Sequence, residues 1–284
     1  MKYILIILIV FFLISRYRIK IMNMLLSLIQ VFIIHINDIT YFNILSRAAR
    51  PILKFFVTKK SFKFIYPNIE LIYDKNISSP NSLEPKQSIV IVNGGAFIAN
   101  DSFDLYICDA MQLKFPNHQI ISIHTLKNVS FDLIIDQFKK DWSELINNKI
   151  TITHVFAHSA GASIILSLSK YYRLPKLILI SPFIVWNISK ITTDMITLDF
   201  IKPQMILRII KDFNFNIKNY FNPLNINSIK IFVGSNEVLL ADVQYFCIDN
   251  NIKDLTILPN NPHGLITWLV YNNFDINIIF NNLT

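Results

Sequence analysis

Ser159 stands where a serine hydroxyl can act as a nucleophile. The run 150–156 before it is β-branched and aromatic, which predicts a buried strand, and residues 160–170 repeat apolar side chains at helical spacing. Ala157 and Gly161 keep both flanks small, as a tight strand-to-helix turn needs. Such a turn presents the serine Oγ at the carboxyl edge of a sheet, which is the geometry of acyl transfer. An ordinary strand-to-helix turn is the alternative interpretation.

Two adjacent glycines follow another apolar run. The segment Asn93-Gly-Gly-Ala-Phe97 comes directly after 88–92, which predicts a second buried strand. The N–H groups of Gly94 and Gly95 then lie outside any strand ladder and are able to converge on an oxyanion, usually the largest electrostatic contribution to acyl transfer. A plain glycine turn is the alternative.

A histidine and two acids follow later strands. His263 lies on a loop of prolines and glycine after the predicted strand 254–258, where a mobile general base is expected. Glu237 follows the predicted strand 230–233 and is the preferred acid to orient that histidine. Asp242 is the alternative acid, although its place in the first turn of the next helix also suits a helix amino terminus.

The remaining histidines and the cysteines suggest no other chemistry. The histidines lie in predicted strands, in the turn beside the serine, in a loop or in the amino-terminal arm: His35, His118, His124, His154 and His158. They show no paired metal-ligand spacing. Cys108 and Cys247 form no framework and are interpreted as buried apolar residues. We therefore expect no metal and no cofactor.

These groups need a scaffold that brings strand ends together. Seven apolar runs predict strands: Ile69–Tyr73, Ser88–Val92, Gln119–His124, Ile150–Phe156, Lys176–Ile180, Lys230–Val233 and Asp254–Leu258. Helical segments alternate with them, among them about 102–115 and 131–147. This alternation predicts an α/β fold with a mostly parallel central sheet covered by helices, in which the residues just past the strands meet at one edge.

The basic charge is concentrated at the amino terminus. The 284-residue chain has a formal net charge of +8, and residues 1–64 hold ten basic groups against one acid, so the body is close to neutral. Because the arm is strongly apolar between its charges, a membrane surface fits it better than nucleic acid. We expect residues 1–20 to form a membrane anchor and 21–66 an amphipathic basic helical arm or cap. A pair of core helices is the alternative.

Several motifs together resemble one family. They are Asn93-Gly-Gly-Ala-Phe97, Ala157-His-Ser-Ala-Gly161, Asn222-Pro-Leu224, Gly234-Ser-Asn-Glu-Val-Leu-Leu-Ala-Asp242 and Pro262-His263. As a set they are similar to the hormone-sensitive-lipase branch of the α/β-hydrolases, which includes arylacetamide and steryl-acetate deacetylases, and the likeness covers about 85–275. The chain order of the serine, the acid and the histidine is also that of an α/β-hydrolase. The resemblance implies an α/β-hydrolase domain over 67–284 with a helical cap inserted at about 183–226.

The resemblance implies carboxylester hydrolysis by a serine esterase, lipase or deacetylase that forms an acyl-enzyme. Ser159 would be the nucleophile, His263 the base and Glu237 its acid partner. The oxyanion hole would be formed by three backbone N–H groups: those of Gly94, Gly95 and Ala160.

The chain departs from the family at two points. The family's H-G-G-G is here Asn93-Gly-Gly-Ala96, and its Y-R-L-A-P-E is absent around 124–128. Asn93 can still hold the loop by hydrogen bonds, and Ala96 still offers an N–H. The altered loop also suits a rival function, that of a catalytically silent α/β-hydrolase-fold protein acting as a binding or scaffolding module.

The predicted cap offers apolar surface to a substrate. Its large apolar residues are Phe183, Trp186, Met195, Phe200, Met205 and Ile206. Some of them must complete the cap's own core. An apolar pocket with one polar catalytic edge suits an apolar ester or lipid, such as an acyl or sterol ester. Membrane-anchored members of the family imply an endomembrane location such as the endoplasmic reticulum, with orientation and oligomeric state left open.

The arm predicts membrane attachment by apolar burial. Each buried methylene contributes about 0.8 kcal/mol to the free energy of membrane binding. Each basic residue adds about 1 kcal/mol, but only when the lipid is anionic. Carbonate or high salt should therefore leave the full-length protein in the membrane pellet, whereas deletion of residues 1–36 should shift it toward the soluble fraction. Full-length protein that stays in the supernatant after fractionation would show that these helices are cap or core.

Overall fold

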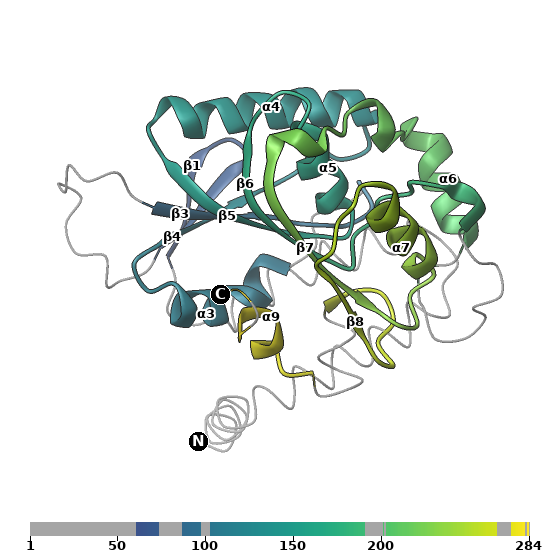
Figure 1. The fold of residues 1–284 in the computed structure, drawn as a ribbon. Coiled ribbons are helices and arrows are strands. Elements are labelled where there is room, and N and C mark those ends of the chain that lie inside the picture. The colour runs from purple at the N-terminus through teal and green to yellow at the C-terminus, as the bar shows by residue number, and fades with distance from the viewer. Residues whose placement is uncertain are drawn as a thin grey trace, which may run out of the picture.

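A sheet of eight strands organises the described part of the chain (Figure 1). The computed structural model describes residues 61–73, 87–97, 103–190, 201, 203–265, 274–281 and 283. The strands are β1 (Ser61–Tyr66), β2 (Ile69–Tyr73), β3 (Gln87–Val92), β4 (Gln119–Ile123), β5 (Thr151–His158), β6 (Leu174–Ile180), β7 (Ile226–Gly234) and β8 (Leu255–Leu258). The helices are α3 (Phe103–Lys114), α4 (Phe131–Asn147), α5 (Ala160–Leu168), α6 (Pro203–Phe213), α7 (Leu240–Asp249) and α9 (Asn277–Asn281), with the short 3-10 helices η1 (Ile188–Lys190), η2 (Ile217–Asn219) and η3 (Pro223–Asn225).

The predicted mostly parallel sheet is confirmed. Its strand order is β1-β2-β4-β3-β5-β6-β7-β8. From β4 to β8 in that order all neighbours are parallel, whereas β2 is antiparallel to both β1 and β4. Parallel neighbours need crossover connections, which helices supply here. The carboxyl ends of β3, β5, β6, β7 and β8 therefore lie at the same edge of the sheet.

Both faces of the sheet are buried. On β3, Val90 and Val92 belong to one apolar cluster, together with residues of α4 and α5. Ile89 and Ile91, which point the other way because side chains alternate along a strand, belong to a second cluster with residues of α3 and α9. Figure 1 accordingly shows α4 and α5 on one face of the sheet and α3 and α9 on the other.

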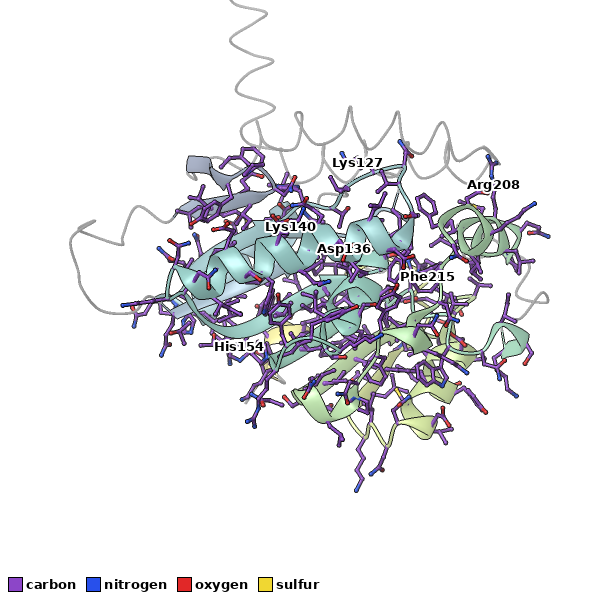
Figure 2. All side chains as sticks on the ribbon, turned by 90° about the horizontal axis from the view of Figure 1, so that it is seen from above. Lys127, Asp136, Lys140, His154, Arg208 and Phe215 are labelled. Atoms are coloured by element: carbon purple, nitrogen blue, oxygen red, sulfur yellow. The ribbon has the colours of Figure 1, made fainter. Side chains whose placement is uncertain are left out.

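Helix α4 shows how one face of the sheet is covered. Its bounds agree with the helix predicted over 131–147. Phe138 and Trp142 are buried and four residues apart, whereas Asp136 and Lys140 are exposed. Figure 2, seen from above, shows α4 lying along the sheet with these two charged residues on it.

Residues 61–66 correct the predicted extent of the helical arm. The sequence analysis assigned 21–66 to helix, but Ser61–Tyr66 is β1, paired antiparallel with β2. In this segment Phe62 and Phe64 alternate with Lys63, which is the period-two pattern of a strand. The basic charges of the arm suit an amphipathic helix, but this alternation favours the strand that the structure shows.

The predicted cap and anchor remain predictions. Between β6 and β7 the chain forms η1, α6, η2 and η3, so this connection is helical in its described part. The anchor and most of the arm fall on residues 1–60, which lie outside the described residues. Within the residues that the structure describes, no helix combines the length and the apolar character needed to cross a membrane.

Candidate active site

Ser159 occupies a sharp turn between β5 and α5, as the sequence predicts. Its φ of 49° and ψ of −121° are uncommon for a residue with a side chain. The Ser159 N–H donates to the Ile180 carbonyl at 3.1 Å, and the Ser159 carbonyl accepts from the N–H groups of Ala162 and Phe183, each at 3.0 Å. Contacts from two neighbouring segments thus hold the turn in its strained conformation.

Gly161 allows the loop Asn93–Phe97, called the glycine loop below, to approach this turn. A Cβ at this position would overlap the carbonyl oxygens of Val92 and Asn93, which are backbone atoms that cannot easily move. The start of the Asn93–Phe97 loop is therefore in contact with the first turn of α5. Ala160, whose N–H is expected to serve the oxyanion hole, is the first residue of α5 and is buried.

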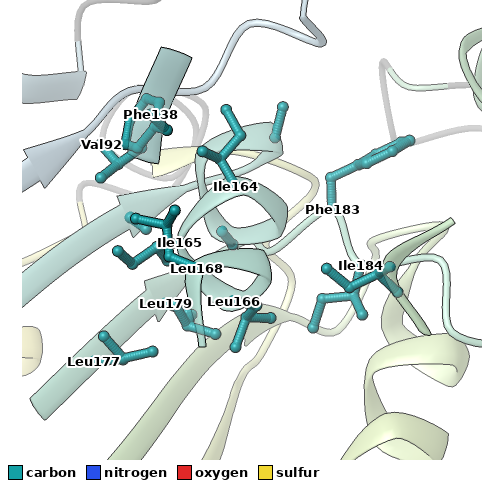
Figure 3. Close-up of a cluster of buried hydrophobic side chains, with 14 of the residues drawn as sticks. Val92, Phe138, Ile164, Ile165, Leu166, Leu168, Leu177, Leu179, Phe183 and Ile184 are labelled. Atoms are coloured by element: carbon teal, nitrogen blue, oxygen red, sulfur yellow. The ribbon is translucent and has the colours of Figure 1, made fainter. Parts of the chain in front are cut away.

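Helix α5 is buried in the core along its whole length. All nine of its residues are buried. Figure 3 shows its side chains Ile164, Ile165 and Leu168 in a cluster that also contains Val92 and Phe138. Because the helix is fixed in the core, the position of Ser159 at its amino terminus is fixed as well.

Ser159 and His263 are joined by a direct hydrogen bond. The Oγ of Ser159 lies 2.9 Å from Nε2 of His263, which stands on the loop after β8. Both residues are nearly removed from solvent, with exposed fractions of 6% and 1%. In this arrangement the imidazole nitrogen can take the hydroxyl proton.

Glu237 completes the hydrogen-bonded chain. Its Oε2 lies 3.0 Å from Nδ1 of His263. Its Oε1 accepts two hydrogen bonds, from the Gly234 N–H at 2.7 Å and from the Ser181 hydroxyl at 2.7 Å. The carboxylate is fully buried, so its contacts with protein groups replace those that water would make.

The buried environment of Glu237 raises the pKa of its carboxyl group. Burial raises the pKa of Glu237 to about 8, and the hydrogen bonds from Gly234 and Ser181 oppose that rise, as does the charge of His158. The carboxyl group therefore loses its proton in the neutral to mildly alkaline range, and the two donors favour the ionised form.

Asp242, the alternative acid, has other partners. Its two carboxylate oxygens accept from the backbone N–H groups of Trp186 at 2.8 Å and Asn187 at 2.5 Å. These bonds tie α7 to the connection that follows β6. Of the two candidate acids, Glu237 is the one that the structure brings to His263.

The glycine loop has three residues with positive φ values, and hydrogen bonds of the Asn93 side chain hold its first residue in place. Gly95 has a φ of 109°, and Ala96 and Phe97 also have positive φ values, of 53° and 62°. The buried Asn93 side chain donates from Nδ2 to Ser122 Oγ at 3.1 Å and accepts at Oδ1 from the Asp104 N–H at 3.0 Å. The prediction that Asn93 holds this loop by hydrogen bonds is confirmed. Gly94 lies beside it and is buried.

Ser181 is a residue of the site that the sequence analysis missed. It directly follows β6, and its hydroxyl contacts Glu237. Its place directly after the predicted strand 176–180 makes it a candidate, because ligands in such sheets bind at the carboxyl ends of the strands, but nothing in the sequence indicates its contact with Glu237.

Another polar cluster contains Asp104, whose backbone N–H donates to Asn93. The ligand atoms of Glu70, Asp104 and His124, all buried, lie within 4.8 Å of one another. Glu70 Oε2 and His124 Nε2 already form a hydrogen bond of 2.8 Å. Because these two side chains already bind each other, we assign the cluster no metal.

The chain is similar in structure to several esterases and lipases. A hormone-sensitive lipase from a metagenome library superposes with a TM-score of 0.60 at 14% identity, covering 86% of this chain and 93% of that one. An esterase from Pyrobaculum calidifontis gives 0.61 at 11% identity, covering 83% and 88%. EstE5, in a crystal soaked by p-nitrophenyl butyrate, gives 0.58 at 14% identity, covering 83% and 87%. No protein-family model and no curated protein sequence matches the chain.

These similarities define the fold. The chain has the α/β-hydrolase fold, as the motifs predict, and the similar structures include bacterial esterases of the hormone-sensitive-lipase family. At such low identities the likeness does not extend to a particular activity. The resemblance to arylacetamide and steryl-acetate deacetylases stays a prediction.

The burial of Glu237 predicts a stability that depends on pH. Its pKa is about 8 in the folded protein against 4.5 for the free side chain, so between these values the folded state binds more protons than the unfolded state. The free energy of unfolding should therefore fall as pH rises from about 5 to about 8. In Glu237→Gln this titration is absent, and the variant should gain about 1 kcal/mol per pH unit relative to the wild type.

Urea unfolding across this pH window measures the effect. The matched control is Glu144→Gln, which replaces an exposed glutamate on α4 and should follow the wild type. A stability difference between Glu237→Gln and the wild type that is constant with pH would contradict the prediction.

Proposed function

We propose that the protein is a serine carboxylester hydrolase that uses Ser159, His263 and Glu237. The observation that carries the proposal is the pair of hydrogen bonds from Ser159 Oγ to His263 Nε2, at 2.9 Å, and from His263 Nδ1 to Glu237, at 3.0 Å. A nucleophile, a base and an orienting acid in this geometry are what acyl transfer needs. Support of a second kind comes from the esterases and lipases that share the fold.

Acylation begins with proton transfer from Ser159 to His263. As Oγ attacks the ester carbonyl carbon, Nε2 takes the hydroxyl proton, and the Glu237 carboxylate stabilises the imidazolium that forms. The carbonyl oxygen becomes an oxyanion, which the N–H groups of the oxyanion hole stabilise: those of Gly94, Gly95 and Ala160. The bond to the alcohol oxygen then breaks, and the alcohol leaves with the proton from His263.

Deacylation repeats these steps with water. The water attacks the acyl carbon while His263 takes one of its protons. When the bond to Oγ breaks, the serine recovers its proton and the carboxylic acid is released. The protein thus returns to its starting state, and no redox or metal step is required.

Aromatic residues near Ser159 support an apolar substrate. Phe183, whose N–H donates to the Ser159 carbonyl, has its ring 6.0 Å from that of Phe97 on the glycine loop. The rings of Phe213 and Phe215 lie 5.5 Å and 5.6 Å from that of Phe97. Three of these four rings belong to the predicted cap segment. All four rings are buried, so the part of the core next to the glycine loop is apolar, which favours an ester with an apolar acyl or alcohol group.

Two finer parts of the proposal rest on the sequence. The motifs favour a deacetylase-like member of the hormone-sensitive-lipase branch. The apolar and basic arm favours attachment to a membrane, and the resemblance to anchored deacetylases favours an endomembrane. Both would narrow the substrate to a lipid-soluble ester.

Substitution of the nucleophile or the base tests the proposal. Ser159→Ala and His263→Ala should each lower kcat for p-nitrophenyl butyrate by about a thousandfold or more, because these residues act as a unit. The control Ser167→Ala removes another buried hydroxyl, which donates to the Ser163 carbonyl within α5, and should keep near-normal turnover. Near-normal turnover in either test variant would reject the proposal, and a wild type no faster than Ser159→Ala would favour a binding module.

The choice of acid has its own test. Glu237→Gln should lose much of the activity because the imidazolium loses its charged partner. Asp242→Asn should lose far less, since Asp242 contacts the backbone of Trp186 and Asn187. The two variants are compared by kcat/KM on the same ester, and the reverse ranking would move the acid to Asp242.

A further inference from the structure

Ser181 links two loops of the candidate active site. It is fully buried and directly follows β6. Its hydroxyl donates to Glu237 Oε1 at 2.7 Å and accepts from the Gly264 N–H at 2.9 Å. Glu237 stands on the loop after β7, and Gly264 is the residue next to His263 on the loop after β8. One hydroxyl therefore touches both the acid and the segment that carries the base.

The directions of these two hydrogen bonds are fixed by chemistry. A backbone N–H can only donate, so Oγ must accept from Gly264. The hydroxyl proton points to Glu237 Oε1, which accepts it best when ionised. The bond thus favours the carboxylate form of Glu237 over its acid form.

The backbone of Ser181 is fixed in a position from which the hydroxyl reaches Glu237 and Gly264. Its N–H donates to the Phe232 carbonyl at 2.8 Å, which fixes it to β7. Its φ of 45° is in the region that glycine adopts most easily. A residue with a side chain is strained at such a φ, so the contribution of serine at this position lies in its hydroxyl and not in its backbone.

We propose that Ser181 is a positioning residue that holds the Glu237 carboxylate and the His263 loop in one hydrogen-bonded unit and favours the ionised form of Glu237. The proposal rests on the proposed function, because it assigns Ser181 a part in the same reaction. Ser181 touches no reacting atom and acts through Glu237.

The pH dependence of ester hydrolysis tests the proposal. Ionised Glu237 supports His263, so the rise of kcat/KM with pH in the wild type should include a midpoint set by the ionisation of Glu237, whose pKa burial raises and which lies against His263 and in the field of His158. In Ser181→Ala the midpoint should move up by about one unit, because a hydrogen bond to the charged form is lost. The variant should therefore lose about tenfold in kcat/KM near neutral pH and approach the wild type well above the new midpoint.

Two further variants serve as controls. One tests whether the effect comes from the Ser181 hydroxyl or from its strained backbone, and the other tests whether loss of any buried hydroxyl has the same effect. Ser181→Gly lacks the hydroxyl and relieves the strain at positive φ, so it should shift the midpoint as Ser181→Ala does. Ser167→Ala, which removes a buried hydroxyl in α5, should leave the midpoint unchanged. A loss in Ser181→Ala that is proportionate at every pH, or no loss, would overturn the proposal.

A titration that needs no catalysis distinguishes this proposal from the proposed function. The carboxyl carbon of Glu237, labelled with carbon-13 and identified by its absence in Glu237→Gln, is followed by NMR across pH in the wild type and in Ser181→Ala. An upward shift of its midpoint in a protein that hydrolyses no ester would uphold the contact and reject the hydrolase. An unchanged midpoint in an active enzyme would reject the role of Ser181 and leave the hydrolase standing.

Discussion

The buried contact between Glu237 and His263 is the interaction on which the rest of the site depends. The two side chains have exposed fractions of 0% and 1%, so neither can rely on water to satisfy its polar atoms. Glu237 meets this need with both of its oxygens, one on the imidazole and the other on Ser181 and the Gly234 N–H. The histidine is thereby oriented with its second nitrogen toward Ser159.

The parallel sheet brings these groups together from distant parts of the sequence. β6 pairs with β7 through Ile180 and Phe232, and β7 pairs with β8 through Gly234 and Leu258, so three strands end side by side. At Gly234 a Cβ would overlap the Asn261 carbonyl, which shows how closely the turn after β7 approaches the loop that leads to His263. This approach places the loop of Glu237 next to the loop that carries His263, where the carboxylate contacts the imidazole.

The local parts of this account could be predicted from the sequence. Alternating apolar runs predict most of the strands, and the position of Ser159, Glu237 and His263 just past three of them predicts their meeting at one edge. Glu237 was also preferred over Asp242. The parts that depend on contacts between loops could not be predicted: nothing in the sequence shows that Asp242 binds the backbone of Trp186, or that the hydroxyl of Ser181 reaches Glu237. The strand β1 is hard to predict because its short apolar alternation adjoins a long basic and apolar arm that favours helix.

The central claim is that His263 activates Ser159 as a nucleophile, and covalent labelling tests it most directly. The protein is treated with an alkyl fluorophosphonate, and the site and rate of modification are followed by mass spectrometry. The account predicts a single adduct on the peptide that contains Ser159, no adduct in Ser159→Ala, and labelling of His263→Ala slowed by several orders of magnitude. An adduct at another residue, or labelling of His263→Ala at the wild-type rate, would contradict it.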